Sequence, residues 1–185
     1  ALGYVVSQAR MKAHLHHQMA ELGIKTYVAE ATAYNAQKQQ LTLSNGKRLH
    51  ADCFLAADGR HSWFRKALSI EQSTHDYRQK AIVATVLSEH PHQHIARQRF
   101  LPSGPLALLP LKDPYASALV YSLNEEKADE VNQYKDAAFS AHLTKQMNEP
   151  QLGQCKIVGN RHLFPLSAEH ALTYQRNRVW LLGDA

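Results

Sequence analysis

The sequence predicts an α/β fold with α+β character, built from two parts. Two apolar runs, at residues 53–57 and 178–182, lead into turns made of glycine and aspartate. Such runs are typical of buried strands in a parallel sheet, whose carboxyl ends meet at the edge where ligands bind. Between them, residues 81–122 hold several strand-like segments, which predict a separate and mostly antiparallel sheet with flanking helices.

The first part begins with an amphipathic helix at residues 7–22. Ser7 can cap this helix, its apolar residues recur every three or four positions, and Gly23 can end it. Asn45 and Gly46 then predict a hairpin, because both residues tolerate positive φ. The strands expected in this part lie at residues 24–30, 40–44, 47–51, 53–57 and 178–182, with a short helix at 62–68.

The second part carries a strand pattern interrupted by helices. Asn124 can cap helical stretches that continue to residue 147, with a break near Lys135. The strands expected here lie at residues 81–87, 97–101, 106–111, 117–122 and 155–164. We place the boundaries so that residues 1–72 and 175–185 form one part and residues 73–174 the other.

Composition excludes several function classes. The chain has 185 residues, 44% of them hydrophobic, which is enough for a buried core. The formal charge is +5, but Lys and Arg are scattered without a basic run, so we expect no nucleic-acid partner. No apolar stretch is long enough to span a membrane and no leader opens the chain, which predicts a cytoplasmic protein. Cys53 and Cys155 lie in apolar stretches, and we expect both to be buried free thiols.

Two turns are the candidate chemical sites. In ADCFLAADGRHSWFR at 51–65, Asp58 and Gly59 follow a strand and precede a helix start that also carries Arg65. Amides at a helix start attract phosphate, and a carboxylate at a strand end can accept hydrogen bonds from ribose. An ordinary β-turn is the alternative for Asp-Gly. In NRVWLLGDA at 177–185, Gly183 allows close backbone approach and Asp184 offers an acceptor to a polyol.

Taken together and in this order, the two turns resemble motifs of the flavin-dependent aromatic hydroxylases related to para-hydroxybenzoate hydroxylase. The resemblance continues through GYVV at 3–6, the segment HDYRQKAIVATVLSEHPHQHIARQRFLPSGPLALLPL at 75–111, and FPLSAEHALTY at 164–174. These segments are similar to the ubiquinone-biosynthesis hydroxylases, and most similar to the branch acting on 2-polyprenyl-6-methoxyphenol. The similarity covers nearly the whole chain.

The resemblance implies an FAD enzyme that uses NADPH or NADH to hydroxylate a polyprenylated phenol. By family position, Asp184 with Gly183 would contact the FAD ribityl chain, Asp58 with Gly59 would serve FAD and pyridine nucleotide, and Arg65 would support the nucleotide end. Gln8 lies where some relatives place a glutamine against FAD. The inner face of the second part's sheet would roof the flavin and an apolar pocket. Implied partners are the phenol substrate, a ubiquinone-biosynthesis complex and peripheral contact with the inner membrane.

The chain also departs from the family pattern. Ala56 replaces a usual glycine, Ser7 and Gln8 replace Glu-Asn, and no GxGxxG occurs in the sequence. We therefore expect a fragment that has only part of the FAD-binding domain. Two other functions stay open: another FAD-dependent phenol hydroxylase or prenyl reductase, and a non-catalytic module that binds lipid or a partner protein.

Other polar residues are weaker candidates. The groups His14, His16, His17 and His90, His92, His94 have no acidic or cysteine partners at ligand spacing, so we expect solvated surface histidines and no metal. Tyr77, Arg97 and Arg99 fall near the predicted substrate sheet, where an ordinary strand position is the favoured interpretation. No catalytic acid or base is assigned.

The missing glycine-rich motif leads to a first prediction. The 185-residue chain, purified alone, should be colourless and should not turn over NADPH, because no glycine-rich helix start within it can hold the dinucleotide pyrophosphate. An absorbance spectrum checks this: a stoichiometric flavin band near roughly 450 nm, which belongs to the cofactor rather than to the fold, would contradict it.

Overall fold

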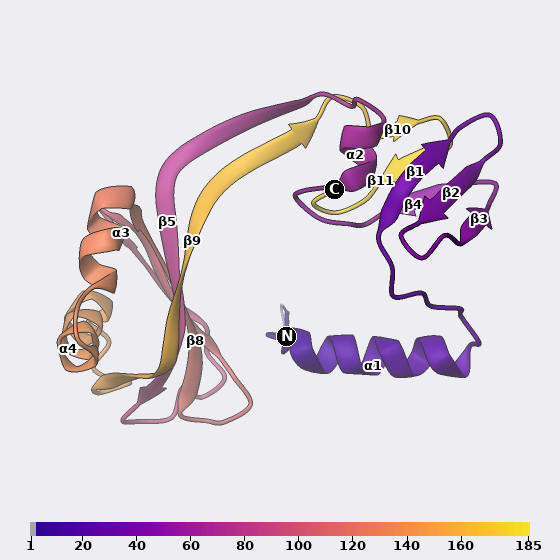
Figure 1. The fold of residues 1–185 in the computed structure, drawn as a ribbon. Helices are drawn as coiled ribbons and strands as arrows, with labels where there is room; N and C mark the ends of the chain where they lie inside the picture. The colour runs from indigo at the N-terminus through magenta and orange to yellow at the C-terminus, as the bar shows by residue number, and fades with distance from the viewer. Residues whose placement is uncertain (1–2) are drawn as a thin grey trace. The chain divides into compact units, whose positions relative to one another are not determined.

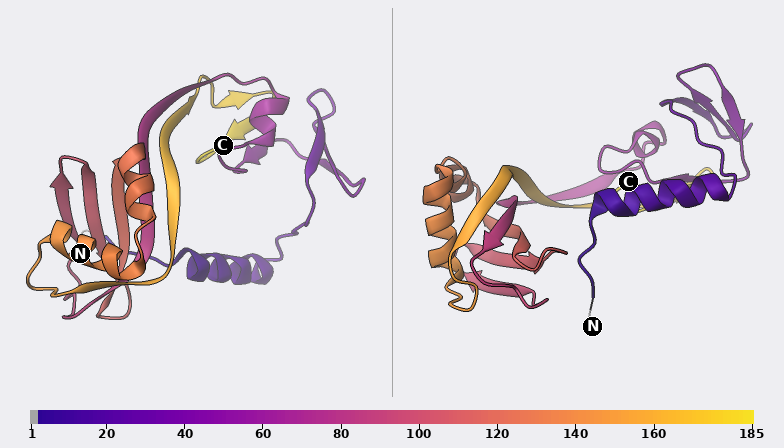
Figure 2. Two further views of the ribbon diagram at one scale, coloured as in Figure 1. Left: turned by 60° about the vertical axis from the view of Figure 1, so that its left-hand side comes forward. Right: turned by 90° about the horizontal axis from the view of Figure 1, so that it is seen from below.

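The computed structural model describes residues 3–185 and divides into two compact units. Unit 1 contains the residues up to 16 and residues 76–167, and unit 2 contains residues 17–75 and 168–185. Two long strands, β5 (Gln72–Ser88) and β9 (Cys155–Ala171), supply residues to both units and run side by side (Figures 1 and 2). Which ligand each unit binds stays a prediction.

Unit 1 is built on a five-stranded sheet of order β6-β7-β8-β5-β9. The remaining strands are β6 (Arg97–Leu101), β7 (Gly104–Pro110) and β8 (Ala116–Asn124). The pairs β6/β7, β7/β8 and β8/β5 are antiparallel. The predicted antiparallel sheet is thus confirmed, although β5 and β9 extend well past the predicted ranges of 81–87 and 155–164.

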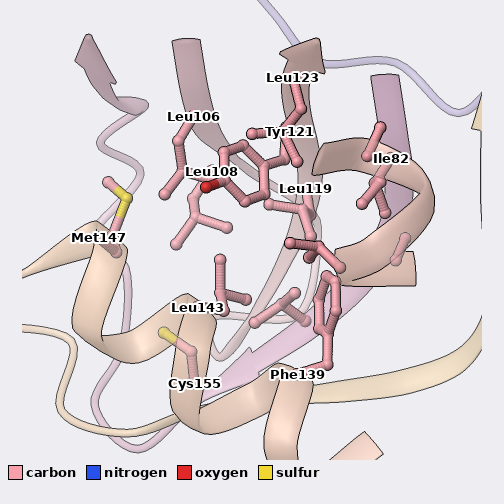
Figure 3. Close-up of a cluster of buried hydrophobic side chains, with 14 of the residues drawn as sticks. Ile82, Leu106, Leu108, Leu119, Tyr121, Leu123, Phe139, Leu143, Met147 and Cys155 are labelled. Atoms are coloured by element: carbon pink, nitrogen blue, oxygen red, sulfur yellow. The ribbon is translucent and has the colours of Figure 1, made fainter. Parts of the chain in front are cut away.

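One face of this sheet is covered by two helices, α3 (Glu125–Asn132) and α4 (Asp136–Met147) (Figure 1). Asn124 caps α3 as predicted, because its Oδ1 accepts the amide proton of Lys127 at 3.0 Å. The helical conformation is interrupted before Lys135, as predicted, and α4 begins at the next residue. The core between helices and sheet includes Ile82, Leu106, Leu108, Leu119, Tyr121, Leu123, Val131, Phe139, Leu143 and Met147 (Figure 3).

Strand alternation assigns the side chains of β7 to opposite faces. Leu106 and Leu108 are buried against the helices, whereas Ala107 and Leu109 point to the opposite face and are only partly buried. The same alternation places Val83 and Val120 on that opposite face. We call it the open face, since α3 and α4 do not cover it.

Glycine is required at the start of β7. Gly104 has φ +133°, and a Cβ atom there would lie 2.3 Å from the backbone oxygen of Ser122. The turn between β6 and β7 therefore brings the backbone so close to β8 that no larger residue fits without movement of a strand.

Helix α4 also protects an edge of the sheet. β9 is an edge strand, and two of its amides donate to hydroxyls on α4: Cys155 to Thr144 Oγ1 at 3.0 Å, and Ile157 to Ser140 Oγ at 3.1 Å. Ser140 and Thr144 are one helical turn apart, so both hydroxyls face the strand. Unpaired edge amides are thereby satisfied at this end of β9.

The predicted N-terminal helix is confirmed as α1 (Gln8–Glu21). It ends in a Schellman motif: the amide of Ile24 donates to Met19 and that of Gly23 to Ala20, while Gly23 has φ +65°. The predicted strand at residues 24–30 is wrong, because this segment is extended but pairs with no strand among residues 3–185. Its Val28 side chain is fully exposed, and only Glu30 at the end of the segment bonds a neighbouring strand end, through Ser44.

Unit 2 contains two small sheets. In the first, β1 (Ala31–Asn35), β2 (Gln40–Leu43) and β3 (Arg48–His50) are antiparallel. The β2/β3 hairpin is confirmed: Gly46 has φ +78°, and Asn45 Oδ1 accepts the amide proton of Lys47. The second sheet has the order β10-β11-β4, from β10 (Gln175–Arg176), β11 (Val179–Leu181) and β4 (Phe54–Ala56).

The short helix α2 (Trp63–Ala67) packs beside these sheets, as predicted for residues 62–68. The rings of Tyr34, Phe54 and Phe64 meet with centroids 5.3 to 6.0 Å apart. Aromatic contacts of this kind contribute beyond simple area burial and join both sheets to the helix. Tyr34 also donates through its hydroxyl to the carbonyl of Asn177 at 2.6 Å, which ties β1 to the turn before β11.

The cysteine prediction is half right. Cys155 is buried, and burial raises the pKa of its thiol, as expected of an unreactive core residue. Cys53 is exposed, because it shares a face of β4 with Leu55, which is 63% exposed, and no described element packs on that face. The expectation that 53–57 is covered on both faces is therefore wrong for residues 3–185.

A second prediction follows from the two faces of β7. Leu108→Ala should lower the free energy of unfolding by roughly 2 to 5 kcal/mol, because it leaves a cavity in the helix-packed core. Leu109→Ala, the matched change on the open face, should lower the free energy of unfolding much less. Urea denaturation of both variants measures the difference, and equal losses would mean that both faces are core.

Candidate functional site

The turn after β4 is organised by the carboxylate of Asp58. Its Oδ2 accepts the amide protons of Trp63 at 2.7 Å and Phe64 at 3.4 Å, while Ser62 Oγ accepts that of Arg65 at 3.1 Å. The first amides of α2 therefore already have acceptors within the chain, and helix α2 is only five residues long. The geometry therefore gives no support to the phosphate contact expected at this helix start. The backbone of the turn at Asp58 and Gly59 remains accessible to a ligand.

Gly59 gives this turn its shape. It has φ +77°, and no heavy atom lies within 4 Å of where a Cβ would be. The conformation rather than crowding therefore favours glycine here. The residue leaves free space beside the backbone at the end of β4, as a close ligand approach requires.

Arg65 is a buried residue with its partners inside unit 2. It is 7% exposed, and its guanidinium donates to the carbonyl of Arg60. Arg60 in turn forms an ion pair with Glu169 at 2.6 Å. These bonds fix the loop between β4 and α2, so Arg65 is placed to hold the loop's shape.

The turn after β11 differs, because its carboxylate is free. The amide of Ala185 donates to the carbonyl of Leu182 at 3.3 Å, which places Gly183 and Asp184 at the two central positions of the turn. Gly183 has φ +63° with open space around it. Asp184 is exposed, and within residues 3–185 its carboxylate takes part in no hydrogen bond or ion pair. It can therefore accept hydrogen bonds from an external polyol.

Parallel pairing brings the two turns to one edge. Val179 pairs with Phe54 and Leu181 with Ala56, and the amide of Leu182 donates to the carbonyl of Ala56 at 2.8 Å. Both strands therefore end at the same level, and Asp58-Gly59 and Gly183-Asp184 follow from adjacent strand ends. The neighbourhood expected from the sequence is present in the structure. The roles of these residues stay predictions.

Gln8 is the first residue of α1, is exposed and belongs to unit 1. Its expected contact with FAD stays a prediction, since the turns described above lie in unit 2.

Unit 1 contains a hollow on one face of the sheet for which the sequence predicts an apolar pocket. It has a volume of about 1000 Å³ and lies between the start of the chain and the open face of the sheet, against Val83, Thr85 and Ala118. Tyr4 to Ser7 and Arg10 form its other wall. Strand alternation assigns side chains to the two faces of the sheet, but it does not show that residues 4–7 and Arg10 lie across from one of them.

The histidine and arginine candidates are mostly structural. His92 is 1% exposed, so the expectation of a solvated histidine is wrong there; its ring bonds the carbonyl of Asp113 and the amide of His94. Arg97 is buried and donates to the carbonyl of His92, and Arg99 donates to the carbonyl of Gln146 at the end of α4. These contacts hold the loop before β6 and cap α4.

His14, His16, His17, His90 and His94 are exposed, as is Tyr77. Among residues 3–185 there is no group of three or more His, Cys, Asp or Glu side chains arranged to hold a metal ion. In the same residues, no helix has the length and apolar character needed to cross a membrane.

Comparison with known proteins decides the family. A family model described as the FAD binding domain matches residues 4–185. The chain belongs to this family. The match includes both turns and the whole of the unit 1 sheet, so the resemblance inferred from the motifs is confirmed.

Among curated relatives, the chain is 35% identical over 179 residues to the ubiquinone biosynthesis monooxygenase COQ6 of Danio rerio, covering 79% of the chain and 37% of that protein. It is 30% identical over 188 residues to the ubiquinone hydroxylase UbiL of Rhodospirillum rubrum, covering 100% of the chain and 43% of that protein. The ubiquinone hydroxylase UbiM of Neisseria meningitidis is 27% identical, with 40% of it covered. The chain thus spans about two fifths of the length of these relatives.

Solved structures support the fold. The halogenase CndH matches with a TM-score of 0.76 at 16% identity, over 98% of this chain and 46% of that one. The flavin-dependent monooxygenase PieE, solved with FAD and substrate, matches with a TM-score of 0.71 at 17% identity, over 97% of this chain and 34% of that one. At such identities the likeness concerns the fold alone.

The described residues fit an FAD cofactor in part. The free Asp184 carboxylate and the open backbone of Gly183 suit a polyol such as the ribityl chain. Asp58 suits it less well, because one of its oxygens already serves α2. When bound, FAD would supply the redox chemistry, and these residues would hold and orient it.

The different surroundings of the two aspartates give a third prediction. Asp58→Ala should destabilise the chain by about 1 kcal/mol, because two amides of α2 lose their acceptor. Asp184→Ala should change stability by less than about 0.5 kcal/mol, as surface changes usually do. Thermal unfolding of the two variants tests this. A larger loss of stability for Asp184→Ala than for Asp58→Ala would contradict the hydrogen bonds assigned to these two carboxylates.

Proposed function

We propose that this chain is part of an FAD-dependent monooxygenase that uses NADPH or NADH to hydroxylate a polyprenylated phenol in ubiquinone biosynthesis. The observation that carries the proposal is the parallel pairing of β4 with β11, which brings the Asp58 and Asp184 turns to one strand edge. The names of the relatives supply the reaction class, since COQ6 is a ubiquinone biosynthesis monooxygenase and UbiL a ubiquinone hydroxylase.

In this proposal the two units have different tasks. In unit 2, Asp184 accepts hydrogen bonds from the cofactor's polyol, and Gly183 and Gly59 allow the backbone to approach it. Asp58 and Arg65 keep the first turn in shape through α2 and Arg60. FAD, when bound, supplies the redox chemistry for oxygen insertion.

In unit 1, the open face of the sheet binds the phenol and keeps water from it. Val83, Ala118 and the partly buried Leu109 give this face an apolar surface, as a prenylated aromatic substrate requires. Because the apolar surface of such a tail favours lipid, the proposal places the enzyme in the cytoplasm with peripheral contact to the inner membrane.

The activity assay uses the full-length protein loaded with FAD. NADPH or NADH oxidation should depend on a prenylated phenol, and mass spectrometry should find one oxygen atom added to its ring. Oxidation without substrate hydroxylation, or reduction of the prenyl double bonds instead, would favour the prenyl reductase alternative. Absence of both, with lipid binding retained, would favour a non-catalytic module.

A fourth prediction concerns the cofactor. In the full-length protein, Asp184→Ala should weaken FAD binding by roughly 10- to 150-fold, the equivalent of the roughly 1.5 to 3 kcal/mol of a charge-assisted hydrogen bond. Asp184→Asn keeps an acceptor without the charge and should lie between. Fluorescence titration of the apoprotein with FAD gives the dissociation constants. If Asp184→Ala binds FAD as tightly as the parent, Asp184 is only a turn residue.

A further inference from the structure

A histidine lies between two tyrosine rings where α4 meets the sheet of unit 1. His142 of α4 is half-buried, while its neighbours Phe139 and Leu143 belong to the core. The Tyr121 ring of β8 stacks on it, with centroids 6.1 Å apart, and the Tyr134 ring meets it edge-on at 5.7 Å. Tyr121 is only 2% exposed and lies among the core side chains (Figure 3). The imidazole therefore joins α4 to β8 and to the connection between α3 and α4.

The polar contacts of this ring favour its uncharged form. The Tyr121 hydroxyl lies 3.5 Å from Nε2 of His142, and it also forms a hydrogen bond with the side chain of Ser103 in the turn between β6 and β7. An uncharged Nε2 can accept the proton of this hydroxyl, whereas a protonated ring has no acceptor nitrogen. Because 3.5 Å is long for a hydrogen bond, the packing of the three rings contributes more to this contact than the bond does.

The charges that act on the ring do not favour a proton on it either. The acidic group is Glu130 of α3, but both its oxygens are 2.7 Å from Nζ of Lys127, and one also accepts the proton of the Tyr134 hydroxyl. Lys127 and, on α4 itself, Lys145 repel a further positive charge. In the described chain, β8 and the β6–β7 turn present hydroxyl groups to the ring rather than charges.

These surroundings give the contact a dependence on pH. Burial first, and the charge of Lys127 second, lower the pKa of His142 below the ordinary value for histidine. The unfolded chain binds the proton at about pH 6.5, and the folded chain binds it only at a lower pH. The contribution of His142 to the free energy of unfolding is therefore complete above about pH 6.5, and it is lost as the pH falls below that value. Mild acid should thus weaken the packing of α4 on the sheet.

Helix α4 covers the thiol of Cys155. This side chain is 2% exposed and lies in the same core cluster as Leu143 and Met147 of α4 (Figure 3). The Cys155 amide also donates to Thr144 Oγ1 at 3.0 Å, so the start of β9 is bonded to the helix. We propose that His142 is an acid-sensitive contact of unit 1: protonation of its ring loosens α4 from the sheet and thereby exposes Cys155.

The test measures how fast Cys155 of the full-length protein reacts with a pyridyl disulfide at about pH 7.5 and at about pH 5.5, on either side of the ordinary histidine pKa. Mass spectrometry of the labelled peptide separates Cys155 from other cysteines. His142→Gln keeps an uncharged side chain that can form hydrogen bonds at both pH values. Comparing parent and variant at one pH removes the effect of pH on the thiol itself.

At about pH 7.5 the two proteins should react at rates within about twofold of each other. At about pH 5.5 the parent should react at least about threefold faster, because only its side chain at position 142 gains a charge. His90→Gln, the same change at an exposed histidine of unit 1, is the control and should match the parent at both pH values. A parent-to-variant ratio that is the same at both pH values would overturn the proposal.

A second measurement needs no folded variant. NMR titration of the imidazole protons of His142 in the parent should give a midpoint below about pH 6.5, and the pH at which the Cys155 reaction accelerates should coincide with it. A midpoint at or above the ordinary histidine value would overturn the proposal. So would a lowered midpoint with no acceleration of Cys155, because the contact would then sense acid without moving α4.

Discussion

The pairing of β4 with β11 is the constraint on which unit 2 depends. Residues 54–56 align in parallel with residues 179–181, which lie more than a hundred positions later in the sequence. Parallel neighbours require a long connection, and here that connection contains the five-stranded sheet of unit 1 with α3 and α4. The buried side chains of Ala56, Val179 and Leu181 provide the apolar contact that holds this pairing, and every polar group of the candidate site depends on it.

Unit 1 solves a different physical problem with its two sheet faces. One face is covered by α3 and α4 and forms a dense core around Leu108, Leu119 and Phe139. The exposed fractions of these side chains are at most 2%. The other keeps small and medium apolar side chains facing a hollow. Rigidity on the first face is what allows the second to hold a shape without being filled, because side chains on both sides of a strand move with one backbone.

Much of this organisation is predictable from the sequence, and the failures have specific causes. The helix ending at Gly23, the Asn45-Gly46 hairpin and the cap at Asn124 depend on neighbouring residues, so local patterns suffice for them. The exposure of Cys53 and the burial of His92 depend on which distant elements cover them. No pattern of alternation or spacing contains that information.

The candidate site shows the same division. The sequence predicts that the two turns meet, because strand ends in a parallel sheet share an edge. The sequence does not show that one carboxylate oxygen of Asp58 accepts amide protons from α2 while both oxygens of Asp184 stay free. That difference depends on how the chain turns after Gly59. Two aspartates at adjacent strand ends therefore differ in their ability to accept hydrogen bonds from a ligand, because only Asp58 is already bonded within the chain.

The hydroxyls of Ser140 and Thr144 have a consequence beyond the stability of α4. These hydroxyls accept the amide protons of Cys155 and Ile157. A foreign strand would otherwise use these two donors at the start of β9. The opposite border of the sheet is β6, whose Phe100 side chain is 80% exposed. Strand addition is thereby disfavoured at the start of β9, so misassembly during folding should begin at the β6 border rather than at that end of β9.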